Sequence, residues 1–166
     1  MKKGKSIGKK KNGFDLWAFI LCLLIVFVAG FIGSLFTSNA VDSDWYKINR
    51  PSFTPPNYVF APIWTILYIL IAVSLYLLWT NSKNKKQKRN ILIIFGINLV
   101  LNASWSILFF GLKMPALAFV DIILMLFTIV LMVYYSDKIN KTASYLLLPY
   151  FFWVCFASVL NAGFIF

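Results

Sequence analysis

Amide and indole side chains recur at helical spacing inside the third long apolar stretch of this sequence. Asn98, Asn102, Trp105 and Phe109 are separated by four, three and four residues, so a helix places them on one face. An amide that faced lipid would lack hydrogen-bond partners, which is costly, so this face must point into the protein. We consider two roles for Asn98 and Asn102: hydrogen bonds between neighbouring helices, or polar contacts that orient a bound ligand.

The fifth apolar stretch repeats the pattern with Pro149, Trp153, Ala157 and Asn161, each four residues apart. Trp153 lies about ten residues from one end of its stretch, which at ~1.5 Å per residue places it near the middle of a membrane. Tryptophan belts occur at membrane surfaces and do not explain this position. The small Ala157 one turn away predicts a wall with room beside it, and simple filling of the core is the alternative.

The second stretch adds Trp64 and Tyr68, four residues apart on one helical face. By depth, six side chains fall between the membrane midplane and its outer surface: Trp64, Tyr68, Asn102, Trp105, Trp153 and Ala157. Aromatic walls with a few polar groups suit a flat apolar ligand, which gains about 0.5–1.5 kcal/mol from stacking on each ring. Trp64 and Trp153 are also candidates for a redox role.

Several kinds of chemistry are excluded by composition. The chain has no His, and its five acidic residues are all Asp, so His-ligated haem, a His general base and a three-His zinc site are ruled out. We expect no metal site, no covalently attached cofactor and no conventional catalytic residues. Cys22 and Cys155 have no ligand spacing and are expected to be buried thiols. Asp121 is the acid inside a predicted span. It has a role in transport, forms a structural pair within the bundle, or lies at a water-exposed outer position.

Five apolar stretches must position these side chains, and each is long enough to cross a ~30 Å hydrocarbon core. The chain has 166 residues, 61% of them hydrophobic, which leaves little room for a soluble domain. We predict an all-α membrane protein, a bundle of five transmembrane helices over residues 16–166, preceded by a basic tail at 1–15. The predicted spans are Leu16–Phe36, Val59–Trp79, Asn90–Phe110, Ala116–Tyr135 and Ala143–Phe166.

The strong positive charge marks orientation in the membrane. Sixteen Lys and Arg against five acids give a net charge of +11, but the basic residues lie at the ends of the spans, so nucleic acid is not an expected partner. Five crossings put thirteen of these residues on the side of the N-terminus and three on the other. The positive-inside rule then predicts a cytoplasmic N-terminus and an outer C-terminus in the cell membrane, with membrane lipid as a partner.

The connection between the first two spans, residues 37–56, differs from the other loops. It reads TSNAVDSDWYKINRPSFTPP, is not basic, and combines aromatic residues with three prolines. Trp45, Tyr46 and Phe53 gain by burial, and prolines reduce the entropy lost on ordering. We predict a lid on the outer end of the bundle, with a passive connector as the alternative. Small residues in the first span, among them Gly30 and Gly33, serve packing in the bundle or a dimer contact.

These residues resemble the tryptophan-rich sensory protein family, also called the translocator protein or peripheral-type benzodiazepine receptor family. The run WYKINRPSFTPPNYVFAPIWTILY is similar to its first loop and second helix, WYxxLxKPxWxPPxxxFxxxWxxLY. NLVLNASWSILFFG resembles its third helix, and LLPYFFWVCFASVLN its fifth. Phe53 stands where the family usually has Trp, and the cholesterol motif that animal members carry after the fifth helix is missing, which places a sterol role in doubt.

The resemblance implies a five-helix bundle, often a homodimer, with a pocket under the first loop. Family members bind porphyrins, notably protoporphyrin IX, and benzodiazepine-type ligands; transport and light-dependent porphyrin breakdown have also been proposed. Carried over by motif position, the pocket is lined by Tyr46, Pro51 and Phe53 in the loop, above Trp64, Tyr68, Asn102, Trp105, Trp153 and Ala157.

Three functions follow as hypotheses. The first is a membrane sensor that binds porphyrin or a similar flat lipophile. The second is an enzyme that oxidises porphyrin in light, with Trp64 and Trp153 as redox partners. The third is a transporter of porphyrin or small lipophiles that uses Asp121.

Overall fold

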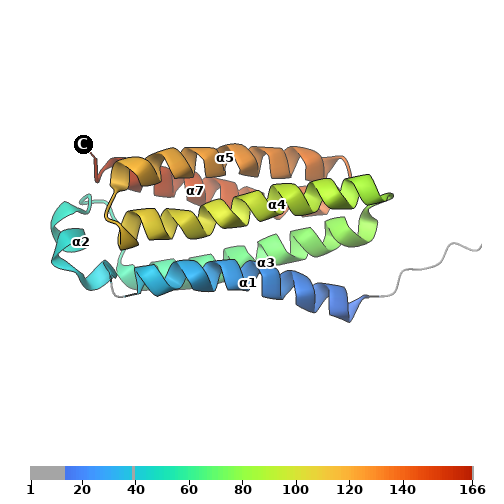
Figure 1. Ribbon diagram of the computed structural model, residues 1–166, viewed down its shortest axis with the longest axis horizontal. Helices are drawn as coiled ribbons and strands as arrows, with labels where there is room; N and C mark the ends of the chain where they lie inside the picture. The colour runs from blue at the N-terminus through green and yellow to red at the C-terminus, as the bar shows by residue number, and fades with distance from the viewer. Residues whose placement is uncertain (1–13, 39, 166) are drawn as a thin grey trace, which may run out of the picture.

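The computed structural model describes residues 14–38 and 40–165, and within these ranges every regular element is helical. Five helical segments are long and apolar enough to cross a membrane, and they lie side by side in Figure 1. The prediction of an all-α protein with five spans is therefore confirmed. The expected basic tail falls largely on residues 1–13, outside the described residues.

The spans are built from the following elements. They are α1 (Leu16–Thr37), α3 (Asn57–Asn81), α4 (Lys85–Ser106) continued by the π-helical η2 (Ile107–Gly111), α5 (Pro115–Asp137), and α6 (Lys141–Tyr145) followed by α7 (Leu148–Ala162). The loop between the first two spans holds η1 (Ala40–Asp42) and α2 (Asp44–Asn49), which lie across the left end of the bundle in Figure 1.

Side-chain caps start the three spans that run in one direction. Asp15 accepts a hydrogen bond from the Ala18 amide (3.1 Å), Asn84 from Gln87 (2.9 Å), and Asn140 from Ala143 (3.1 Å). Each cap satisfies an amide that lacks a partner in the first turn. The two spans that run the other way start at prolines, Pro56 before α3 and Pro115 at the start of α5, where a missing amide costs nothing.

The fifth span is interrupted, whereas the sequence predicted one helix over Ala143–Phe166. A turn at Leu146 and Leu147 separates α6 from α7, and α7 ends at Ala162. Pro149 provides a physical reason, because it has no amide to bond the carbonyl four residues earlier. Leu146 and Leu147 keep right-handed helical backbone angles, so α6 and α7 together form the fifth span.

The helices do not contact each other equally. α4 packs along both α1 and α5, α1 packs along α3, and α5 packs along α7, but α3 and α7 touch only sparsely. α3 is instead tied to α6, where the Ser74 hydroxyl donates to the Ala143 carbonyl at 2.8 Å. The bundle is therefore closed around most of its circumference and loosely joined between α3 and α7.

Gly30 and Gly33 of α1 face the inside of the bundle, whereas Ser34 is exposed. A methyl group on Gly30 would overlap the ring of Tyr68, and one on Gly33 would lie 3.0 Å from the Ser106 hydroxyl. Of the two roles that the sequence left open for these glycines, close packing within the bundle is the one the structure supports.

Candidate functional site

The described part of the lid packs through an aromatic group that we call the lid cluster, composed of Trp45, Tyr46, Phe109, Phe110 and Phe164. Tyr46 is 5% exposed and stacks on Phe164 with ring centroids 5.5 Å apart. Trp45 meets Phe109 at 5.7 Å and Phe164 at 5.5 Å. The lid is thus held between η2 and the chain that follows α7.

The other two lid residues of the predicted pocket, Pro51 and Phe53, differ in how they pack. Pro51 lies against the end of α7, where a methyl group on Gly163 would overlap its ring. Phe53 is 54% exposed, and the structure does not bring it into the lid cluster. The lid is further tied to α3, because the Asn57 side chain donates to the Val41 carbonyl at 3.3 Å.

Burial also controls the ionisation of the lid. Desolvation in the lid cluster raises the pKa of the Tyr46 phenol, and the nearby positive charge of Arg50 opposes this shift in part. The phenol is therefore held in its neutral form while the lid is docked.

A hydrogen-bonded network joins four helices at the centre of the bundle. The Tyr68 hydroxyl on α3 donates to Asn102 Oδ1 on α4 at 2.9 Å. Asn102 donates to the Tyr150 hydroxyl on α7 at 3.4 Å, and Tyr150 donates to Asn98 Oδ1 at 3.1 Å. Asn98 in turn donates to Thr128 on α5 at 2.8 Å. The two amides face inward as predicted, and their polar atoms are engaged by protein partners.

Trp105 makes a second polar link nearer the lid. Its indole donates to Asn161 Oδ1 at 3.0 Å, and Asn161 donates to the Pro115 carbonyl at 2.8 Å. The Trp105 ring stacks on Phe109 at 5.0 Å. Trp105 therefore connects the central bundle to the lid cluster.

Trp64 and Tyr68 stack as their spacing predicts. Their ring centroids are 5.3 Å apart, and Trp64 also meets Tyr150 edge-on at 6.2 Å. These rings form a continuous aromatic group that leads from α3 to α7.

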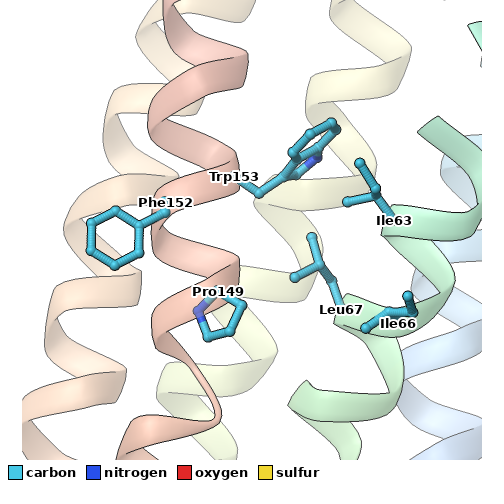
Figure 2. Close-up of a pocket in the computed structure, with 6 residues that line it drawn as sticks. All are labelled: Ile63, Ile66, Leu67, Pro149, Phe152 and Trp153. Atoms are coloured by element: carbon cyan, nitrogen blue, oxygen red, sulfur yellow. The ribbon is translucent and has the colours of Figure 1, made fainter. Parts of the chain in front are cut away.

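Trp153 borders open space. A groove of about 390 Å³ that is open to the outside lies between α3 and α7, and we call it the α3–α7 groove. Figure 2 shows the Trp153 indole reaching from α7 toward Ile63 on α3. The groove is lined by Ile63, Ile66, Leu67, Pro149, Phe152 and Trp153.

The sequence predicted room beside the wall that Trp153 forms, with the small Ala157 one turn away. The groove borders Trp153 on the side of Pro149, one turn before it. Ala157 packs against the core of the bundle. The groove lies where α3 and α7 contact each other only sparsely, which no spacing along one helix reveals.

The indole nitrogen of Trp153 is buried and has no hydrogen-bond partner in the described structure. The ring is packed edge-on against Phe60 at 5.8 Å and tilted against Phe156 at 5.6 Å. An unsatisfied buried donor costs about 1–3 kcal/mol, so such a group at the edge of a cavity is suited to a ligand that supplies an acceptor.

Asp121 lies apart from the groove, at the contact of α4 and α5. It is 8% exposed, and its Oδ1 accepts a hydrogen bond from the Ser104 hydroxyl at 2.7 Å, while Oδ2 is buried without a partner. The structure thus shows a buried pairing rather than a water-exposed position. Within the described residues no group of three or more His, Cys, Asp or Glu side chains is placed to hold a metal ion.

Three contributors to the site were missed from sequence. Tyr150 and Thr128 complete the central network, and Phe60 packs on Trp153. A polar Tyr150 three residues before Trp153 was an available signal, because a phenol inside a membrane span needs a partner. Phe60 had a signal too, because it matches the Phe that stands four residues before the Trp64 position in the family motif.

Comparison with known proteins places this architecture in a family. Residues 22–166 match the model of the TspO/MBR family. The chain is 42% identical to the tryptophan-rich protein TspO of Archaeoglobus fulgidus over 142 residues, which cover 86% of this chain and 91% of the relative. It is 38% identical to the protein of the same name from Chlorobaculum tepidum, in a match that covers 85% of this chain and 89% of the relative. The translocator protein of Bos taurus is 29% identical, in a match that covers 83% of this chain and 82% of the relative. This membrane-spanning chain therefore belongs to the TspO/MBR family.

Proposed function

We propose that this protein binds a flat, apolar ligand of the tetrapyrrole class, such as protoporphyrin IX, beside Trp153. The observation that carries the proposal is the buried, unpartnered indole nitrogen of Trp153 at the edge of the α3–α7 groove. Its volume of about 390 Å³ falls within the range of roughly 300–1,000 Å³ typical of small-molecule sites.

The chemistry of the surroundings supports a planar aromatic ligand. The Trp153 indole offers a face for stacking, and its neighbours Phe60 and Phe156 hold it in place. The nitrogen is buried in the observed position and would donate to an acceptor on the ligand if the indole turned toward it. Because the chain has no His, recognition by a His–metal bond is excluded, and we propose a metal-free porphyrin held by stacking and apolar contact.

We also propose an orientation in the cell membrane, with the N-terminus in the cytoplasm. The ends of the spans support it, because the basic segments between α3 and α4 and between α5 and α6 lie at the same end of the bundle as the start of α1, opposite the lid (Figure 1). At this end Lys88 lies over the Trp79 ring at 4.2 Å, and Lys138 over Tyr134 at 3.8 Å. Such cation–aromatic pairs suit a membrane surface.

Binding is tested by titrating the protein in lipid nanodiscs with protoporphyrin IX and following the porphyrin absorbance. We expect micromolar or tighter affinity for the wild type. Trp153→Ala removes stacking surface and the indole donor and is expected to weaken binding about tenfold, equivalent to ~1.4 kcal/mol. The matched control is Trp17→Ala, which alters an 82%-exposed indole on α1. Equal affinity in the wild type and the Trp153 variant contradicts the proposal.

A further inference from the structure

We infer that the ligand of the proposed site enters sideways from the bilayer, through the α3–α7 groove, and does not pass under the lid. The inference rests on the proposed function, because it concerns the route to the same Trp153. It also limits the ligand to compounds that dissolve in the membrane.

The lid side of the bundle is closed by several independent contacts. Tyr46 and Trp45 pack into the lid cluster, Pro51 lies against Gly163, and Asn57 ties the lid to α3. Beneath the lid, Phe109 and Trp105 stack on each other at 5.0 Å. A planar ligand that came from this side would have to pass between packed aromatic rings.

The side between α3 and α7 is open by comparison. The rim of the groove is formed by Ile66 and Phe152, which are 57% and 66% exposed. Both residues lie inside segments that qualify as membrane spans, so the surface they expose faces lipid chains. In Figure 2 Ile66 extends from α3 and Trp153 from α7 into the space between the two helices, whereas the Phe152 ring points away from α3.

The backbone of both walls explains why this seam is loose. Pro62 lies inside α3, one residue before Ile63, and leaves the Tyr58 carbonyl without its helical partner. Pro149 stands at the start of α7, after the turn that separates it from α6. α3 is anchored to α6 through Ser74 and Ala143, away from the groove. Each wall therefore contains a proline, and the amide that it lacks leaves one helix hydrogen bond unmade.

The lining defines the class of ligand that can use this route. All six lining side chains are apolar except for the Trp153 indole N–H, and none carries a charge. A water-soluble, charged compound would lose its hydration in the groove, and no charged side chain of the lining would replace it. A membrane-dissolved planar molecule loses little, and the Trp153 side chain is part of the wall that it meets.

The route is tested by two pairs of variants that leave the central network intact. Ile66→Trp narrows the rim, and its control Ile69→Trp adds the same bulk at another exposed position on α3. Phe152→Ala widens the rim, and Val159→Ala is its control on α7. Each protein is placed in liposomes preloaded with protoporphyrin IX, and the rate of binding is followed by the porphyrin absorbance.

We expect Ile66→Trp to slow association on the order of tenfold and Phe152→Ala to speed it, with both controls at the wild-type rate. Phe164→Ala, which removes a ring of the lid cluster, is expected to leave the rate unchanged. The inference is overturned if the two rim variants match their controls, or if Phe164→Ala alone accelerates binding. A wild type that binds no porphyrin refutes the proposed function instead, so the two failures are distinguishable.

Discussion

The ring of Tyr68 on α3 lies so close to the backbone of Gly30 on α1 that a single added methyl group would overlap it. The ring cannot easily withdraw, because it stacks on Trp64 and its hydroxyl donates to Asn102 at 2.9 Å. The closeness of α1 therefore helps to set the position of the aromatic residues at the centre of the bundle.

Gly30→Ala is expected to destabilise the protein by about 1–3 kcal/mol, because the overlap forces Tyr68 off its stacking position or α1 away from α3. The measurement is thermal unfolding in detergent. Gly96→Ala is the control, since a methyl group there meets nothing within 4 Å, and it should be neutral or slightly stabilising. If both substitutions lower stability equally, the close approach at Gly30 is not the cause.

Tyr150→Phe tests the central network. The change removes the hydroxyl that lies between Asn98 and Asn102 and leaves the Asn98 carbonyl oxygen without its donor. Hydrogen bonds between helices in membranes are individually modest, so we expect a loss of about 0.5–2 kcal/mol in unfolding free energy. Tyr145→Phe, at an exposed phenol on α6, should have no effect, and a loss of the same size there would remove support for the network.

The lid is expected to loosen at alkaline pH. Burial raises the pKa of Tyr46 in the docked lid, whereas an exposed phenol ionises near pH ~10. The contribution of Tyr46 to docking is therefore complete below about pH 10 and declines as the pH rises above that value. Tryptophan fluorescence, which reports on Trp45 in the lid cluster, should shift above this pH in the wild type. The same shift in Tyr46→Phe would show that another group is responsible.

The spans could be predicted from sequence because their signal is local. A run of apolar residues long enough to cross a membrane requires no knowledge of its neighbours, and inward-facing amides such as Asn98 and Asn102 follow from helical spacing. Burial of both residues confirms that part of the prediction. The Trp64–Tyr68 stack is local for the same reason.

The partners across helices could not be predicted in the same way. That Trp105 donates to Asn161, or that Tyr150 lies between the two amides, depends on how four helices are rotated about their axes. The position of the groove depends on the sparse contact between α3 and α7. Spacing along one helix carries no information about a gap between two helices.

The central claim is that a porphyrin binds against Trp153, and indole ¹⁵N–¹H NMR spectra of the protein in nanodiscs test it most directly. The cross-peak of Trp153, identified by its loss in Trp153→Phe, is expected to move strongly when protoporphyrin IX is added, because the porphyrin ring current acts only at short range. The indoles of Trp17 and Trp79, at the opposite end of the bundle from the lid, should keep their positions. A Trp153 cross-peak that stays in place at saturating porphyrin would contradict the account.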